Sequence, residues 1–444
     1  MSISAALQSA ISGLNGQATA IGYISDNVAN ASTTGYKKVE SRFSTLVTQS
    51  SAQANTHSPG GVLNQPFFAN NAQGAIAQVS STTSIAISGD GFIPVSRAVG
   101  IDPTTGDTIF DDTSYYTRVG DFTQNSAGYL VNSSGYYLQA WTVDPTTGVT
   151  DTSATTEVQV SNLLDAPVAT SVIDYSANLP ASVTDSDGNL PATLASNSIQ
   201  VYDSLGNSRT LDLSWTRTAA NNWELSISTV DDTGATITLG PASFTFGDLG
   251  TAGTIGTITS GGSINAPASQ TDGDDASVSF AFDFFGDGSS QDITLDLGSF
   301  NSTTGTTQFA GTTLSLNDIA QNGVPRGNFK SLAIDENGYV SVTFDNGNVK
   351  KFYQIPLAKF RDPTELDRVD GNAFAATPGS GTAVLNTAGA SGLGTLVSAA
   401  IEQSNVDIAE EFSKMIVAQR AYSANARLVT VADELLQETI NIRR

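Results

Sequence analysis

Residues with side chains suited to catalysis are scarce in this chain of 444 residues. It contains no cysteine and a single histidine, His57, in a segment with Ser, Pro and Gly that is typical of an exposed loop. Without a thiol and with one imidazole, most nucleophile–base pairs and zinc sites are excluded. The adjacent acids Glu410 and Glu411 lie in a helical pattern of mixed charge, which is typical of a solvated face. The sequence therefore predicts that the protein is not an enzyme.

Two acidic loops remain as candidates for a bound ion. Residues 283–288 place aspartates at the first and fifth positions of a calcium-loop pattern and a glycine at the sixth. The pattern fails at its third and twelfth positions, which Phe285 and Thr294 occupy. Residues 272–275 include three aspartates that could collect a cation weakly. Ordinary turn chemistry explains both loops, so we expect no metal and no cofactor, with weak calcium binding as the alternative.

The net charge of −24 is unevenly distributed, because residues 61–394 carry about −23 of it. An acidic exterior favours solubility, and the lack of Lys and Arg clusters argues against nucleic-acid binding. The first basic residue is Lys37, so the N-terminus does not resemble a cleaved signal peptide. No apolar run approaches the ~18 residues of a membrane-spanning helix. We therefore expect no membrane insertion and, for any export, a route that does not read a conventional signal.

Both ends of the chain show the seven-residue periodicity of helices that pack lengthwise on other helices. One pattern lies within residues 1–30, and the other predicts a helix from about 398 to 441, ~65 Å long at 1.5 Å per residue. The side chains that we predict to form an assembly interface are Leu7, Ile11, Leu14, Ile21, Val28, Ile401, Ile408, Phe412, Met415, Tyr422, Val429 and Leu436.

The first helix is poorly suited to stand alone. Gly13, Gly16 and Gly22 lie inside it, and each costs about 1 kcal/mol of helix stability relative to alanine. Such a segment frays until its apolar stripe is covered. We expect the cover to come from other copies of the chain, so that both ends are disordered in a dilute monomer. A simple helix pair within one chain is the alternative.

The middle of the chain predicts β-structure, because short alternating runs are separated by turns rich in Gly and Asn. A three-stranded meander with Asn-Gly turns is predicted within residues 329–355. The predicted fold is therefore mainly β with α-helical termini, and its β domains are nested between coiled-coil-forming helices. We expect a terminal helical assembly domain, linker segments, an inner β domain and an outer inserted β domain, at residues 1–30 with 398–444, 31–75 with 371–397, 76–149 with 319–370, and 150–318, respectively.

Two long motifs at the ends of the chain carry a resemblance to a known family. Residues 12–37, SGLNGQATAIGYISDNVANASTTGYK, are similar to the N-terminal signature of flagellar rod, hook and hook-associated axial proteins. Residues 401–442 resemble the C-terminal element of the same family. The residues that carry the match are Asn27, Asn30, Gly35, Tyr36, Asn405, Gln419, Arg420 and Asn425.

The middle of the chain distinguishes between branches of that family. Residues 89–141 and 354–374 resemble the inner β domain of hook subunits, whereas a distal rod subunit would be much shorter. The sequence departs from the common pattern where Ile93-Pro94 replaces a second aromatic residue and where Ser423 stands in a position at which Gln is frequent. Residues 150–318 match only loosely, which leaves their internal division open.

The resemblance implies a structural subunit of the flagellar hook, which self-assembles into a curved, flexible tube that transmits torque from motor and rod to the filament. It implies contacts with other copies of the chain, the distal rod protein, the hook cap protein, the hook–filament junction protein and the flagellar export apparatus. It also implies an extracellular location reached without a cleaved signal peptide. The alternatives are another axial protein, such as a distal rod or hook-associated subunit, and an acidic extracellular adhesin or calcium-binding module.

Overall fold

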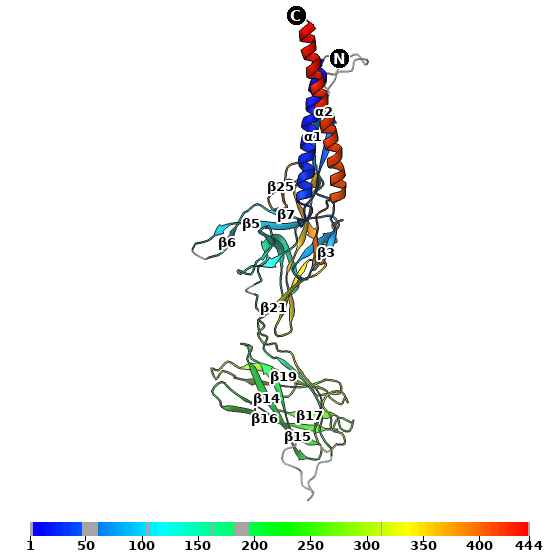
Figure 1. The fold of residues 1–444 in the computed structure, drawn as a ribbon. Coiled ribbons are helices and arrows are strands. Elements are labelled where there is room, and N and C mark those ends of the chain that lie inside the picture. The colour runs from blue at the N-terminus through cyan, green and yellow to red at the C-terminus, as the bar shows by residue number, and fades with distance from the viewer. Residues whose placement is uncertain are drawn as a thin grey trace. The chain divides into compact units, whose positions relative to one another are not determined.

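The computed structural model describes residues 3–46, 61–103, 106–160, 163–181, 195–311 and 313–442. The described chain is mostly β, with helix α1 (Ile3–Ala29) at one end and helix α2 (Ile408–Ile442) at the other, as Figure 1 shows. This confirms the predicted fold class. The chain divides into two compact units, unit 1 with residues 1–162, 330–343 and 349–444, and unit 2 with residues 163–329 and 344–348.

The twelve-stranded sheet draws its strands from two stretches that are far apart in sequence. Its spatial order is β21-β22-β23-β10-β5-β7-β26-β25, with β6, β8, β9 and β11 paired beside this path. The predicted meander is confirmed as β21–β23, and β10 joins it to the earlier stretch. The strands are β5 (Ile93–Ile101), β6 (Thr108–Phe110), β7 (Tyr115–Thr117), β8 (Thr123–Gln124), β9 (Leu130–Val131), β10 (Tyr136–Val143), β11 (Thr150–Glu157), β21 (Phe329–Ile334), β22 (Tyr339–Phe344), β23 (Val349–Gln354), β25 (Asp367–Val369) and β26 (Ala373–Ala375).

Short antiparallel pairs complete unit 1, together with the 3₁₀ turn η1 (Pro363–Glu365). The pair that follows α1 is a hairpin, and three others join distant segments. They are β1 (Val39–Thr45) with β2 (Val62–Phe68), β3 (Ile76–Gln78) with β29 (Ala400–Glu402), β4 (Ile85–Ser88) with β28 (Thr395–Ser398), and β24 (Pro356–Lys359) with β27 (Val384–Thr387).

The predicted start of the C-terminal helix near residue 398 is wrong, because α2 begins at Ile408. Residues 395–402 instead form β28 and β29, which complete backbone ladders with β4 and β3. Leu396 and Ala400 are buried in these strands. Ile401 fits the seven-residue spacing of the helix, but pairing with distant strands places it in β29. Tertiary contacts thus outweigh the local helical pattern here.

An aromatic cluster lies in unit 1, where the two stretches of the sheet meet. The ring of Phe92 makes edge-to-face contacts with Phe360 and Phe374, with ring centroids 5.8 and 5.4 Å apart. Tyr116 and Leu366 are buried in the same cluster. Such edge-to-face pairs are favoured by the quadrupoles of the rings. The cluster thus joins residues before and after the insertion that forms unit 2.

Unit 2 contains two sheets that share one hydrophobic core. Buried and less buried residues alternate along β14 and β15, which is the pattern of strands with one face on a core. The five-stranded sheet has the order β13-β14-β15-β16-β17 and the four-stranded sheet the order β18-β19-β12-β20. The strands are β12 (Val172–Asn178), β13 (Ala195–Tyr202), β14 (Ser208–Ala219), β15 (Asn222–Val230), β16 (Thr236–Phe246), β17 (Ile255–Thr259), β18 (Asp275–Phe282), β19 (Gln291–Ser299) and β20 (Ser315–Gln321).

The chain enters and leaves unit 2 side by side. Asp165 and Gly327 exchange two backbone hydrogen bonds, both of 3.1 Å, so the first and last parts of the unit form a bridge. The Asp165 carboxylate also accepts hydrogen bonds from the side-chain amides of Asn346 and Asn348, at 2.8 and 2.7 Å. This geometry is the one expected of a domain inserted into another.

We predict that replacing Trp215 by alanine unfolds unit 2 selectively. Its side chain is fully buried between the sheets, and loss of such a group costs about 3–5 kcal/mol. Scanning calorimetry should show a lower melting temperature for the transition of unit 2 and no change for unit 1. Leu205→Ala, at a side chain that is 65% exposed in the same unit, should shift neither. An equal shift of both transitions in the Trp215 variant would contradict the independence of the two cores.

Candidate assembly interface

The two terminal helices pack against each other within one chain, as Figure 1 shows. The contact is close because the residues between them are small. A Cβ atom added to Gly13 would lie 2.8 Å from Nδ2 of Asn425, so a larger residue would displace that side chain. The apolar side chains that the two helices bury are mostly alanines: Ala10, Ala20, Ile24, Ala418 and Ala432.

Eleven of the twelve side chains predicted to form an interface lie on the two helices, Ile401 lies on β29, and none of the twelve is fully buried within the chain. Seven are half-buried: Leu7, Leu14, Ile21, Val28, Ile401, Met415 and Val429. Five are exposed: Ile11, Ile408, Phe412, Tyr422 and Leu436. The expectation that each helix lacks a partner within the monomer is therefore wrong, since α1 and α2 are partners. Because small residues make this contact, the larger apolar side chains stay accessible.

Asn27 is the polar centre of the helix pair and is 1% exposed. Its Nδ2 donates to the carbonyl of Val39 at 2.9 Å and to the Glu411 carboxylate at 3.0 Å. Its Oδ1 accepts from the backbone N–H of Val39 at 2.9 Å and from the Tyr36 hydroxyl at 3.2 Å. The amide donors and the acceptor oxygen of Asn27 are thus all hydrogen-bonded. Burial raises the pKa of the Tyr36 hydroxyl beside it. Asn27 therefore fixes α2 and the start of β1 on the end of α1.

The segment after α1 is held against the segment before α2. α1 ends at Ala29, and Asn30 caps it by donating from Nδ2 to the carbonyl of Asp26 at 2.9 Å. Gly35 has φ +67°, and an added Cβ would lie 2.8 Å from Val119, so only glycine fits. The backbone N–H of Gly35 donates to the carbonyl of Glu402 at 2.8 Å.

Asn405 makes the matching connection from the C-terminal motif. Its Oδ1 accepts from the backbone N–H of Lys38 at 2.8 Å, and its Nδ2 donates to the carbonyl of Ala72 at 3.1 Å. The N-terminal and C-terminal motifs are thus two halves of one hydrogen-bonded joint. Gln419 and Arg420 are exposed on α2 and do not enter this joint in the described part of the chain.

A buried ion cluster ties the joint to the β-strands of unit 1. The Glu402 carboxylate accepts from Nζ of Lys37 and from Nη1 of Arg118, the latter at 3.1 Å. Its Oε1 also accepts from the backbone N–H of Gly74 at 2.7 Å. The side chains of Lys37 and Glu402 are 0% exposed and that of Arg118 is 1% exposed. One carboxylate therefore connects the segment after α1, the strand before α2 and the loop after β7.

Two buried cations share this carboxylate, so neutral carbonyl groups satisfy further donors. Lys37 donates to the carbonyl of Ala72 at 2.7 Å, and Nη2 of Arg118 donates to that of Gly89 at 2.9 Å. Burial lowers the pKa of Lys37, and the nearby Glu402 carboxylate opposes that effect. Loss of the carboxylate would leave two buried charges without a counter-ion, which is strongly destabilising.

Sequence reasoning missed this cluster and misassigned Glu411. Glu411 was predicted to lie on a solvated face, but its side chain is 2% exposed and accepts hydrogen bonds from Asn27 and Lys414. Its neighbour Glu410 is 52% exposed, so the prediction holds for that residue alone. Lys37, Arg118 and Glu402 lie within the segments that resemble the family, and the available signal was that Arg118 and Glu402 are isolated charges among apolar and small polar residues. Burial of opposite charges against each other is a tertiary event that a linear pattern does not report.

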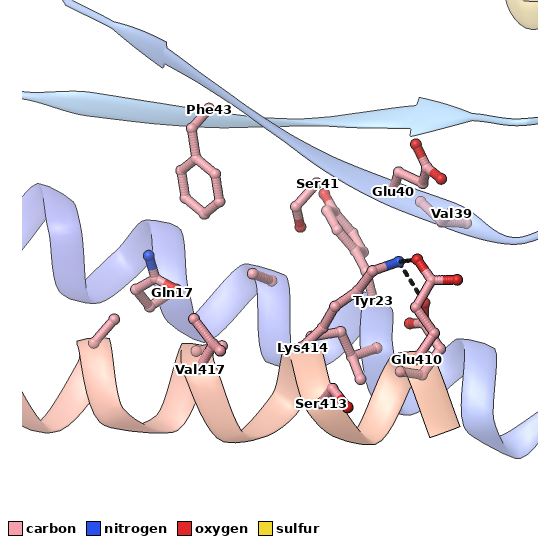
Figure 2. A pocket seen from close by; sticks show the side chains of 15 residues that line it. Gln17, Tyr23, Val39, Glu40, Ser41, Phe43, Glu410, Ser413, Lys414 and Val417 are labelled. Atoms are coloured by element: carbon pink, nitrogen blue, oxygen red, sulfur yellow. Dashed lines mark hydrogen bonds and ion pairs between the residues drawn. The ribbon is translucent and has the colours of Figure 1, made fainter. Parts of the chain in front are cut away.

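A groove of about 630 Å³ opens between α1, β1 and α2, and Figure 2 shows it from close by. Tyr23, Phe43 and Val417 contribute apolar surface, and Phe43 and Val417 are 45% and 67% exposed. Lys414 lies at the rim and bonds to the carboxylates of Glu410 and Glu411 at 2.9 and 2.8 Å. The joint thus carries accessible apolar surface next to a fixed set of charges.

The aspartates of the two acidic loops accept hydrogen bonds from residues of their own turns. Asp283 accepts backbone N–H groups of Phe285, Gly286 and Gly288, and Asp274 accepts from Ser269 and Thr271. Within the described ranges, no cluster of three or more His, Cys, Asp or Glu side chains is arranged to hold a metal ion. His57 lies outside the described residues. No helix in the described part of the chain is long and apolar enough to cross a membrane.

Four family descriptions match successive parts of the chain. They are Flagella basal body rod protein over residues 7–37, Flagellar hook protein FlgE/F/G D1 domain over 86–163, Flagellar basal body protein FlaE D2 domain over 174–324, and Flagellar basal body rod FlgEFG protein C-terminal over 397–442. The first and last of these matches cover the two halves of the joint.

Full-length relatives give the same picture. The flagellar hook protein FlgE of Brucella suis is 31% identical over 444 residues, with 100% of both chains covered. The protein of the same name from Rhizobium meliloti is 31% identical over 453 residues, again with 100% of both covered. That of Escherichia coli is 28% identical and covers 99% of this chain. The crystal structure of the Helicobacter pylori flagellar hook protein FlgE2 matches with a TM-score of 0.43 and 14% identity, over 72% of this chain and 98% of that one.

We predict that Glu402→Gln destabilises unit 1 by about 3–5 kcal/mol, because it removes the counter-charge of two buried cations. Chemical denaturation monitored separately for each unit measures the change. The matched control is Glu410→Gln, which removes the same charge at an exposed ion pair and should cost no more than about 0.5 kcal/mol. Equal effects of the two substitutions would contradict the role assigned to the cluster.

Proposed function

The chain belongs to the flagellar hook protein family and is a structural subunit of the hook, and from this premise we propose that copies join through the terminal module, defined as α1, α2 and the hairpin β1–β2. The relatives are structural proteins, and their similarity along the whole chain favours a hook subunit over another axial protein or an adhesin.

One observation carries the proposal: α2 exposes a large set of apolar side chains although it already has α1 as a partner. Contiguous exposed apolar surface of this kind marks an interaction site. The exposed fractions are 49% for Ile408, 50% for Phe412, 51% for Ile416, 67% for Val417, 42% for Tyr422, 59% for Leu428, 51% for Val431, 50% for Leu435 and 37% for Leu436. Burial of these residues against neighbouring copies would supply the free energy of polymerisation.

Each part of the chain would then have a separate role in the hook. The terminal module would provide the cohesion of the tube. The Glu402 cluster would orient this module on the remaining strands of unit 1, and unit 1 would carry unit 2 as the outer domain. The acidic surface of the middle region favours polar contacts that can shift as a curved tube rotates.

The proposed assembly route is that of an exported axial subunit. Copies would pass through the flagellar export apparatus, without a cleaved signal peptide, and add outside the cell beneath the hook cap protein. The polymer would connect the distal rod protein to the hook–filament junction protein. The polar, glycine-containing α1 supports this order of events, because a helix of that composition gains much of its stability from packing and not from propensity.

We predict that Phe412→Asp prevents polymerisation without unfolding the monomer. The side chain is 50% exposed, so a charge there costs little until a second copy covers it, and then costs several kcal/mol. Electron microscopy after salting-out should show tubes for the parent chain and none for the variant. Val349→Asp, an exposed apolar position on β23, is the matched control and should assemble. Normal tubes from the Phe412 variant would contradict the proposed interface.

A second prediction separates cohesion from curvature. Replacing residues 166–326 by a short Gly-Ser linker is compatible with unit 1, because Asp165 and Gly327 are bridged. The truncated chain should still form tubes, and their images should be straighter or irregularly bent. Unchanged curvature would remove the proposed role of the outer domain, and complete loss of assembly would show that this domain supplies cohesion.

A further inference from the structure

The outward face of α2 carries a regular row of charges. Arg420, Arg427 and Glu434 recur every seven residues and are all exposed. Arg420 follows the buried Ala418 by two residues, which is a rotation of about 200° around the helix axis. The row therefore faces away from the contact with α1.

Neither arginine has an acidic partner among the residues that the structure describes. Side chains three or four positions away on a helix are the ones that can pair, and here these positions hold only uncharged residues. Glu434 follows Arg427 by seven residues, ~10.5 Å along the axis, which is too far for an ion pair within the helix. The uncharged neighbours of the two arginines are Ile416, Val417, Ser423, Ala424, Thr430 and Val431.

The space between the arginines has the form of a socket for a facing helix. Arg420, Ser423, Ala424 and Arg427 stand at positions i, i+3, i+4 and i+7, the four that surround an inserted side chain when helices pack knobs into holes. These four residues, with Ile416 and Gln419, line a groove of about 450 Å³. The small residues leave room in the centre, and the guanidinium groups at both ends favour a carboxylate.

We propose that Glu434 of a second copy occupies this socket, in a parallel contact between two α2 helices offset by 10–11 residues, or ~16 Å. The inference rests on the proposed function, because it requires copies that join through the terminal module. At this offset, Val431 of the second copy meets the preceding socket beside Ile416, and both side chains are 51% exposed. At this offset Arg427 of the second copy lies about 5 Å along the axis from Arg420, so one repulsive contact accompanies the two attractive contacts of Glu434.

A second copy fits this socket because of where the complementary parts lie. The socket and Glu434 occupy different stretches of one helix, so each copy offers one and accepts the other. Such a contact is heterologous and repeats without closing on itself, which an open helical polymer requires. The charge row would thus set the axial offset between subunits, while the apolar residues beside it supply cohesion.

The test is a charge swap in the full-length chain. Arg420→Glu with Arg427→Glu places like charges in the contact, and should raise the critical concentration for tube formation at least about tenfold at low salt. Adding Glu434→Arg to that variant restores opposite charges and should bring the critical concentration back to within about threefold of the parent. High salt should reduce the defect of the double variant. Arg326→Glu with Lys330→Glu is an equal charge change at one exposed loop position and one exposed position on β21, and this variant should assemble like the parent.

Each outcome decides the proposal. Recovery by the triple variant supports it, provided that circular dichroism shows the same helix content in all monomers. Parent-like assembly of the double variant, or failure of the triple variant to recover, overturns it. Phe412→Asp is run in parallel: if it blocks assembly while the double variant assembles, only the offset contact is wrong. If both assemble normally, the terminal module is not the interface and the proposed function fails with it.

Discussion

The organisation of unit 1 depends on two buried ion pairs, which the Glu402 carboxylate forms with Lys37 and Arg118. A buried carboxylate is stable only when its charge and its lone pairs are satisfied. Here the partners come from the segment after α1, from the loop after β7 and from the backbone of Gly74. Three stretches of chain that are far apart in sequence must therefore be in place together. The arrangement at the base of the helices is fixed by these ion pairs, because any other arrangement would leave a buried charge without a partner.

This constraint has a mechanical consequence for a hook subunit. A tube that transmits torque needs subunits in which the cohesive helices cannot turn freely on the β domain. Asn27, Asn405 and Glu402 connect α1, α2 and the inner strands by directional bonds, which resist rotation better than apolar packing alone. Bending would then be taken up between subunits and not inside the joint.

The two helices use different side chains for packing within the chain and for the apolar surface that stays exposed. Alanine and glycine make the contact inside the chain, so the pair forms without consuming its larger apolar side chains. Phe412, Ile416 and Leu428 stay exposed, and we propose that neighbouring copies cover them. Unit 2 has its own core around Trp215 and Trp223. Its first and last parts are bridged at Asp165 and Gly327, as expected of a domain inserted into another.

Local patterns in the sequence were sufficient for the helical ends, the meander within 329–355 and the family, because periodicity, turn chemistry and contiguous motifs are read from neighbouring residues. The same patterns missed the start of α2 at Ile408, since ladders with β3 and β4 claim residues 395–402. They also missed the burial of Glu411 and the Glu402 cluster, and they favoured pairing between copies over the helix pair that forms within one chain. These features join residues hundreds of positions apart. A buried charge is strongly destabilising unless an opposite charge pairs with it. Here the partners come from distant parts of the chain, so only the tertiary fold brings them together.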